Sequence, residues 1–277
     1  MPEEPLIILG MHRSGTTMLT KYLSETGSFF FGADLEHNHE SLTFIKMNDW
    51  ILRNCGASWD FPEPYDHTTD DYKELVKQHL DGYLRRVGWK HFYKKHLGAS
   101  LRRRHHMDSG FWGWKDPRTS LTVDVWLEIF PRARFIHVHR HPLDVALSLQ
   151  SRAQKFCRSV SFTQHLKEQH LIGINKYHES MRVLDLAEGV RLWKHYINSI
   201  AKQNLDIWHV SYESLVNAPE QELRKLSVFL DKDVHSNCDS FNFDRRRVLA
   251  YKNAAIPAKA LALVNDDSAI NELGYHV

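Results

Sequence analysis

The fold of this chain is decided by the stretch LIILGMHRSGTT, residues 6–17. Its four leading apolar residues predict a buried strand, and Gly10 and Gly15 bound a turn that leads into a helix beginning near Gly15. This arrangement directs several backbone N–H groups and the positive end of a helix dipole to one point. The stretch therefore predicts a site for a phosphate group.

The loop matches the phosphate-loop pattern G-x-x-x-x-G-K-[ST] except at one position. Thr16 stands where a loop that hydrolyses nucleoside triphosphates has its lysine, and the cation lies inside the loop instead, at Arg13. We expect this loop to hold a phosphate without the group that usually reaches the terminal phosphate of ATP. An ordinary tight turn is the plain alternative, but two glycines, three hydroxyls and an internal arginine are more than a turn needs.

Composition limits the class of protein. The chain has 277 residues, of which 42% are hydrophobic and 25% charged, and this suits a single domain over residues 1–277. The net charge of +2 gives no general case for binding nucleic acid, and neither a membrane span nor a signal peptide is predicted. Three scattered cysteines predict no disulfide framework and no zinc cluster, and they favour a cytoplasmic location.

Strand and helix patterns alternate along the chain. Strands are predicted at 6–9, 111–115, 134–139 and 207–210, with helices at 16–26, 41–54, 68–87, 122–130, 142–151, around 190–200 and from 219. The second of these helices is expected to have Leu42, Ile45 and the Trp50-Ile51 pair on one side, and Thr68 with Asp71 predicts a capping box for the third. Apolar residues at steps of three and four mark the helix around 190–200: Val190, Trp193, Ile197 and Ile200. This order of strands and helices predicts an α/β fold with three layers, a central mostly parallel sheet and a helical insert at about 41–107. Ligands bind beyond the carboxyl ends of parallel strands, where polar clusters occur at residues 10–17, 115–118, 140 and 211–212.

Four segments of the chain resemble segments of the sulfotransferase family, and they occur in the same order along the sequence. Residues 10–17 resemble the loop that the family uses for a 5′-phosphosulfate, and residues 135–148, FIHVHRHPLDVALS, resemble its 3′-phosphate motif. Residues 210–231, VSYESLVNAPEQELRKLSVFLD, resemble the tyrosine-glutamate segment with its helix, and WKDPR at 114–118 is similar to a run in the bacterial and glycan-type branches. The resemblance implies a P-loop NTPase-like sulfotransferase fold whose helical insert lies on the acceptor side.

The resemblance also implies a donor, 3′-phosphoadenosine 5′-phosphosulfate, and residues that bind it. Tyr212 would lie near the adenine, and Arg140 with Ser148 would hold the 3′-phosphate, since a guanidinium fork and a hydroxyl can converge on one phosphate. The plain alternatives are an ion pair of Arg140 with Asp144 and an ordinary helix serine. The 5′-phosphosulfate would bind His12, Arg13, Ser14, Gly15, Thr16 and Thr17.

Two departures from the family pattern leave parts of the site open. The glycine-rich basic segment near the C-terminus of the cytosolic branch is missing, and residues 245–247, three arginines, are candidates to replace it. The lysine-any-histidine pair that carries the base in that branch is also absent, and Lys115-Asp116-Pro117 occupies a similar place. The chain is therefore closer to the branches whose base is a carboxylate.

The implied reaction is an in-line transfer of a sulfuryl group to a hydroxyl or amine. Fixed donors neutralise the leaving group, so no metal is expected, and Arg13 and Lys115 would stabilise charge on the reacting group. Glu40 is the first choice of general base, with a helix-dipole role as its alternative. The competing bases are Glu36, His37, His39 and Asp116.

The acceptor is left open between a carbohydrate and a small molecule. Residues 85–106 carry eight cations and no acid, which suits either an anionic glycan or an ordinary solvated helix face. Two rival functions remain, a phosphate-loop kinase of small molecules and a non-catalytic nucleotide-binding relative. The oligomeric state is open, a homodimer included.

Overall fold

The computed structural model describes residues 5–93, 112–159, 180–234, 245–265 and 268–275. The chain divides into two compact units. The first contains Met1–Arg140 and His195–Val248, and the second contains His141–Lys194 and Leu249–Val277. The single domain expected from the sequence stays a prediction.

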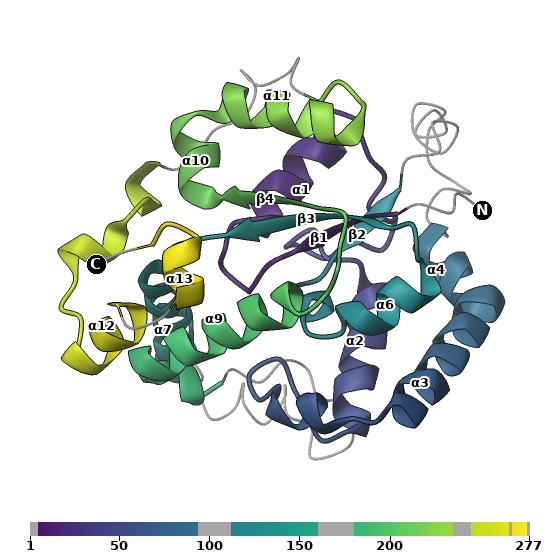
Figure 1. Ribbon diagram of the computed structural model, residues 1–277, viewed down its shortest axis with the longest axis horizontal. Coiled ribbons are helices and arrows are strands. Elements are labelled where there is room, and N and C mark those ends of the chain that lie inside the picture. Colours follow the sequence, from purple (N-terminus) through teal and green to yellow (C-terminus); the bar gives the residue numbers. More distant parts are fainter. Residues whose placement is uncertain (1–4, 94–111, 160–179, 235–244, 266–267, 276–277) are drawn as a thin grey trace. The chain divides into compact units, whose positions relative to one another are not determined.

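A four-stranded sheet forms the centre of the first unit (Figure 1). All its strand pairs are parallel and the strand order is β2-β1-β3-β4. Ile8 is in register with Lys115, and His139 with Ser211, so the carboxyl ends of the strands meet at one edge of the sheet. The parallel sheet predicted from the sequence is confirmed. The strands are β1 (Leu6–Leu9), β2 (Gly113–Lys115), β3 (Arg134–His139) and β4 (Ile207–Ser211).

One face of the sheet packs against helices α1 (Thr16–Glu25) and α11 (Pro219–Leu230), which Figure 1 shows on the same side. Leucines at helical spacing on both helices meet alternate residues of the strands, because successive strand side chains point to opposite faces. The buried cluster contains Leu6, Ile8, Ile136, Val138 and Val210 from the sheet and Leu19, Leu23, Leu223, Leu226 and Leu230 from the helices.

The opposite face is covered by α2 (Leu42–Asn54) and α6 (Val123–Ile129). Phe44 of α2 stacks on Trp114 of β2 with ring centroids 3.9 Å apart, and Trp126 of α6 meets the same indole at 5.1 Å. A short 3-10 helix, η5 (Pro117–Ser120), connects the end of β2 to this layer. Aromatic packing thus fixes α2 to the strand that ends in Lys115.

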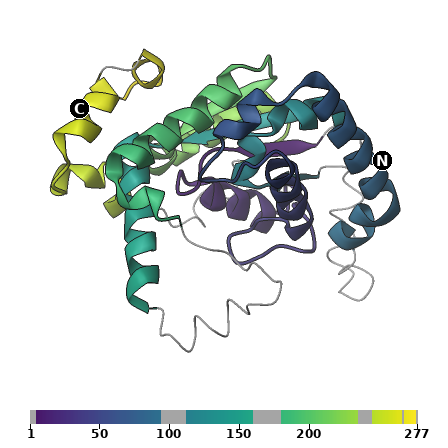
Figure 2. The same ribbon diagram turned by 90° about the horizontal axis from the view of Figure 1, so that it is seen from below.

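A second group of helices follows α2 along the chain. After η1 (Glu63–His67), α3 (Asp70–Tyr83) continues through a π turn, η2 (Leu84–Gly88), into α4 (Trp89–Tyr93). Helix α3 lies beside α6, and α4 lies beside α2 (Figures 1 and 2).

Two details of these helices differ from the sequence prediction. The sequence predicts a capping box opened by Thr68, but Thr69 caps α3 by accepting a hydrogen bond from the Tyr72 amide, because the Thr68 hydroxyl donates to the Tyr65 carbonyl instead. Leu42 and Trp50 were expected on the same side of α2 as Ile51, yet they are 38% and 40% exposed. Much of the basic stretch lies outside the described residues, including Lys94, Lys95 and Arg102–Arg104.

The second unit is helical in its described part. The Asp144 carboxylate accepts a hydrogen bond from the Tyr251 amide at 2.8 Å, and the His141 ring stacks on the Tyr251 ring at 4.1 Å. The strip predicted on one helix by Val190, Trp193, Ile197 and Ile200 is buried. That helix, α9 (Leu186–Ala201), contributes to both units; the other helices here are α7 (Pro142–Ser159), η6 (Arg182–Leu184), η9 (Ala250–Asn253), α12 (Ala258–Asn265) and α13 (Ser268–Glu272).

Candidate functional site

The loop between β1 and α1 depends on its two glycines. Gly10 has a φ of 141° and Gly15, the N-cap of α1, has a φ of 101°; both values favour glycine. A Cβ at Gly10 would lie 2.3 Å from the Val138 carbonyl oxygen, and one at Gly15 would lie 2.6 Å from the Tyr212 ring. The loop is therefore held close to β3 and to the residue that follows β4.

The side chains of the loop point in different directions. The Ser14 hydroxyl is buried and donates to the Met11 carbonyl at 2.7 Å, so it closes the loop internally. Thr16 is also buried, whereas Arg13, with a φ of 73°, is exposed. His12 is half-buried, and its ring meets the edge of Trp59 at 4.9 Å.

A buried ion pair lies directly beside this loop. Lys115, the last residue of β2, is 0% exposed, and its ammonium donates to the Glu40 carboxylate at 2.8 Å and to the Asn38 carbonyl at 2.7 Å. The same Nζ lies 3.3 Å from the Thr17 hydroxyl in the first turn of α1. Three segments distant in sequence thus place a cation and a carboxylate at the end of the phosphate-type loop, where α1 begins.

The backbone before α2 holds Glu40 in this position. Leu35 and Ser41 form an antiparallel bridge, and His39 adopts a φ of 57° in the turn between them. The Asp34 carboxylate fixes the start of α2 by accepting hydrogen bonds from the Ser41 hydroxyl and from the amide and hydroxyl of Thr43. Glu40 is 7% exposed and pairs with Lys115, so the helix dipole is not its main partner.

Burial controls the ionisation of the pair. Loss of solvent raises the pKa of the Glu40 carboxyl above its ordinary value, and the nearby Asp116 charge acts in the same direction. Burial also lowers the pKa of the Lys115 ammonium, against the attraction of Glu40. A carboxylate whose pKa is raised is better matched to accepting a proton near neutral pH than one with an ordinary pKa.

The other candidate bases lie in different surroundings. The side chain of His37 is 82% exposed and lies 3.5 Å from the Glu36 carboxylate, which also accepts from Asn38. Burial and the Lys115 charge lower the pKa of His39. Asp116 is fully buried and is paired with Arg118 at 2.8 Å.

Beyond β3, Arg140 and Tyr212 come together. The Arg140 guanidinium lies over the Tyr212 ring, 4.8 Å from its centroid, and the same ring lies against Gly15 of the loop. Arg140 also donates to the backbone carbonyl of Arg247, in the short helix η8 (Arg245–Arg247). Arg140 is buried, so a guanidinium, an aromatic ring and the loop share one place at the carboxyl edge of the sheet.

The two residues predicted to hold the 3′-phosphate belong to different units. Ser148 lies on α7, in the second unit, whereas Arg140 ends the first unit. Their pairing at a 3′-phosphate stays a prediction. Asp144, the plain alternative partner of Arg140, accepts a hydrogen bond from the Tyr251 amide within its own unit.

Asn48 is a residue that the sequence reasoning missed. It lies on α2, is 0% exposed, and its amide nitrogen donates to the Asp116 carboxylate and to the Thr119 hydroxyl, each at 2.8 Å. Its amide oxygen accepts from the Thr122 hydroxyl at 2.8 Å and from the Trp126 indole at 2.7 Å. A polar residue four positions after Phe44, on the buried side of a helix, is the signal that could have found it.

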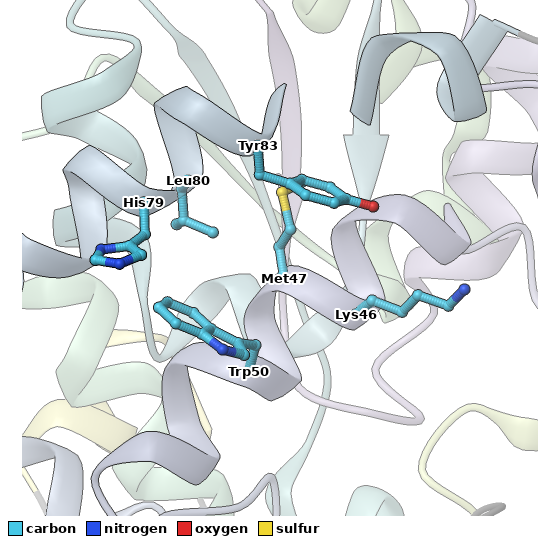
Figure 3. A pocket seen from close by; sticks show the side chains of 6 residues that line it. All are labelled: Lys46, Met47, Trp50, His79, Leu80 and Tyr83. Atoms are coloured by element: carbon cyan, nitrogen blue, oxygen red, sulfur yellow. The ribbon is translucent and has the colours of Figure 1, made fainter. Parts of the chain in front are cut away.

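A separate cavity of about 360 Å³ opens between α2 and α3 (Figure 3). Trp50 and His79 face each other across it with ring centroids 5.9 Å apart. None of the residues predicted to bind the donor lines this cavity. Its lining consists of Lys46, Met47, Trp50, His79, Leu80 and Tyr83.

Two kinds of feature are absent from the described residues. Within them, histidine, cysteine and carboxylate side chains form no group of three that could hold a metal ion. None of the helices in that part of the chain has the length and apolar character needed to cross a membrane.

Comparisons with known proteins agree with this fold. The model of the sulfotransferase family matches residues 5–236. The sulfotransferase domain of the olefin synthase from Synechococcus PCC 7002 is 15% identical, with a TM-score of 0.54 over 99% of this chain and 95% of that one. The sulfotransferase domain of the curacin biosynthetic pathway is 15% identical, with a TM-score of 0.52 over 99% of this chain and 98% of that one. No curated protein matches the chain.

Proposed function

Since the family model matches residues 5–236, the chain belongs to the sulfotransferase family, and we propose that it transfers the sulfuryl group of 3′-phosphoadenosine 5′-phosphosulfate to an acceptor. The acceptor is a hydroxyl or amine of a carbohydrate or small molecule. One observation carries the proposal: Lys115 contacts both Thr17, at the start of α1, and the buried Glu40 carboxylate. A cation and a proton acceptor therefore meet where a transferred anionic group would lie.

The loop and the residues beyond β3 and β4 fit the two ends of such a donor. Backbone amides of Arg13–Thr17, the Arg13 side chain and the N-terminus of α1 bind the 5′-phosphate. Arg140, together with Ser148, binds the 3′-phosphate as a forked cation with a hydroxyl. Tyr212 lies near the adenine. The contact of the Tyr212 ring with both Gly15 and Arg140 supports this assignment.

In the proposed transfer, the acceptor oxygen or nitrogen attacks sulfur in line with the bond to the leaving phosphate oxygen. Glu40 accepts the acceptor's proton as the new bond to sulfur forms. The bond between sulfur and the bridging oxygen breaks, and its electron pair stays with 3′,5′-adenosine bisphosphate. Lys115 stabilises the sulfuryl oxygens and the loop stabilises the leaving oxygen, since both are held in place before the reaction.

The first experiment is a thermal-shift titration with 3′,5′-adenosine bisphosphate. At a hundred times its dissociation constant this ligand stabilises the protein by about 2.7 kcal/mol, a shift of roughly 5–10 °C. ATP with and without magnesium is the comparison ligand. A larger response to magnesium-ATP than to the bisphosphate would overturn the proposed donor and favour a kinase.

The Arg140→Ala variant distinguishes binding of the 3′-phosphate from binding of the 5′-phosphate. Removing a charged hydrogen-bond donor weakens bisphosphate binding by about 10-fold to 100-fold. Binding of adenosine 5′-phosphate, which has no 3′-phosphate, is the internal control and changes little. Equal loss for both ligands would contradict the assignment of Arg140 to the 3′-phosphate.

A further inference from the structure

Helix α2 is attached to the end of β2 at two points. At its N-terminal end, Glu40 reaches Lys115, and two turns further along, Asn48 reaches Asp116, the next residue of the same segment. A single contact lets a helix slide or rotate, whereas two contacts to adjacent residues fix both its position and its rotation. The second attachment therefore determines where the first can form.

The second attachment uses every hydrogen-bonding group of the asparagine side chain. An amide has two donor hydrogens and an oxygen that accepts two bonds, and Asn48 uses all four. Its partners lie on the β2 end, on η5 and on the start and middle of α6. Since the site is fully buried, any displacement of α2 would leave polar groups without partners, which is costly.

The same network reaches the charges that surround Glu40. The Asp116 carboxylate accepts from Asn48 with one oxygen and from Arg118 with the other. The charge of Asp116 raises the pKa of Glu40, while that of Arg118 lowers it. The Asn48 amide is thus bonded directly to a carboxylate whose charge acts on Glu40.

We propose that Asn48 is a positioning residue of the transfer reaction: its four hydrogen bonds set α2 so that the Glu40 carboxylate meets the Lys115 ammonium beside the loop. The inference rests on the proposed function of that pair. Asn48 itself touches neither the donor nor the acceptor. Its effect on turnover is exerted through Glu40 and Lys115.

The decisive variant is Asn48→Asp, which keeps the size of the side chain but replaces the donor that faces Asp116 with a second carboxylate. We expect kcat to fall at least 10-fold at pH 8, with the affinity for 3′,5′-adenosine bisphosphate within 2-fold of the parent. Burial and the facing Asp116 carboxylate raise the pKa of the new carboxyl, so as the pH is lowered it takes up a proton and can again donate to Asp116. The ratio of variant to parent activity therefore rises as the pH falls.

Ile51→Val is the matched control, because Ile51 is buried on the same helix but its side chain carries no hydrogen-bonding group. It lowers the melting temperature without changing the pH dependence of kcat. If Asn48→Asp behaves in the same way, with a constant activity ratio across the pH range, Asn48 supports only the fold and the proposal is wrong.

A crystal structure of the Asn48→Leu variant tests the positioning without any assay. We expect the distance from Lys115 Nζ to Glu40 Oε1 to increase from 2.8 Å. It should pass beyond hydrogen-bonding reach, about 3.5 Å. An unchanged distance would overturn the proposal whatever the activity. If the parent neither binds the bisphosphate nor turns over, the proposed function fails, while this distance still decides the role of Asn48. Should the leucine variant not fold, the same distance is measured in Asn48→Asp.

Discussion

The two faces of α2 use polar side chains in opposite ways. On the inner face, Asn48 is completely buried and all its hydrogen-bonding groups are used. On the outer face, two positions away and roughly 200° around the helix axis, Lys46 and Trp50 are exposed and border an open cavity (Figure 3). The difference teaches that this helix is positioned by its polar interior contacts, so substitutions should have large effects on one face and small effects on the other.

The largest effect is expected at the residue that the inner face positions. Glu40→Gln keeps an acceptor for Lys115 but cannot take up the proton, so kcat should fall about 100-fold to 10,000-fold. The affinity for 3′,5′-adenosine bisphosphate should stay nearly constant, as measured by calorimetry. Glu36→Gln, in the same turn, is the control. Equal turnover by the Glu40→Gln and parent proteins would remove Glu40 from the reaction.

Breaking the ion pair from the other side should reduce stability. Lys115→Met leaves the Glu40 carboxylate buried without its partner, and the loss of one member of a buried pair costs roughly 3–5 kcal/mol. Denaturant unfolding measures the change. The double variant Lys115→Met/Glu40→Gln should be more stable than Lys115→Met alone, because no unpaired charge is then buried. If the loss of unfolding free energy in the double variant equals the sum of the losses in the two single variants, the residues do not interact.

The pH profile gives a smaller but specific effect. Because burial and Asp116 raise the pKa of Glu40, kcat/KM should increase with pH through a midpoint above that of an ordinary glutamate, as the carboxyl loses its proton. Burial lowers the pKa of Lys115, so the alkaline fall should begin below that of an ordinary lysine. Asp116→Asn removes the charge that raises the pKa of Glu40 and should move the acid limb to lower pH. A shift to higher pH would contradict this electrostatic account.

The outer face should show the smallest effect. Lys46→Gln removes a charge from an exposed position, and such changes usually alter the free energy of unfolding by less than about 0.5 kcal/mol. Turnover and bisphosphate affinity should equal those of the parent. A loss of kcat similar to that of Asn48→Asp would show that the two faces of α2 are not distinct.

Local signals made the core of the fold predictable. The strand β3 occupies Arg134–His139 as the alternation of apolar residues predicts, and α1 begins at Thr16 because the glycine before it supports the required backbone conformation. The end of α7 was less predictable: the sequence suggested a helix ending near Ser151, and the structure continues it to Ser159. That extension carries no glycine or proline to mark its end, so composition alone gave no boundary.

Only the site residues at the carboxyl ends of the strands could be placed from the sequence. Lys115, Arg140 and Tyr212 could be placed at one edge because parallel strands share it. The pairing of Lys115 with Glu40 joins residues 75 positions apart and depends on how α2 packs on Trp114, which no local pattern encodes. Trp50 was assigned to the wrong side of α2 for a related reason: an apolar residue satisfies a helical pattern whether it faces the core or a surface cavity.

The π turn between α3 and α4 has a consequence for how this region tolerates change in length. Relative to an uninterrupted α-helix, a π turn holds one additional residue within about the same rotation. The turn therefore absorbs that residue while α4 keeps the phase in which Phe92 is buried against Phe44 and Trp112. Deletion of one residue from 84–88 would let the segment continue as an ordinary α-helix with Phe92 still in the aromatic cluster, whereas an insertion would rotate the ring away by roughly 100°, so this region tolerates a loss of length better than a gain.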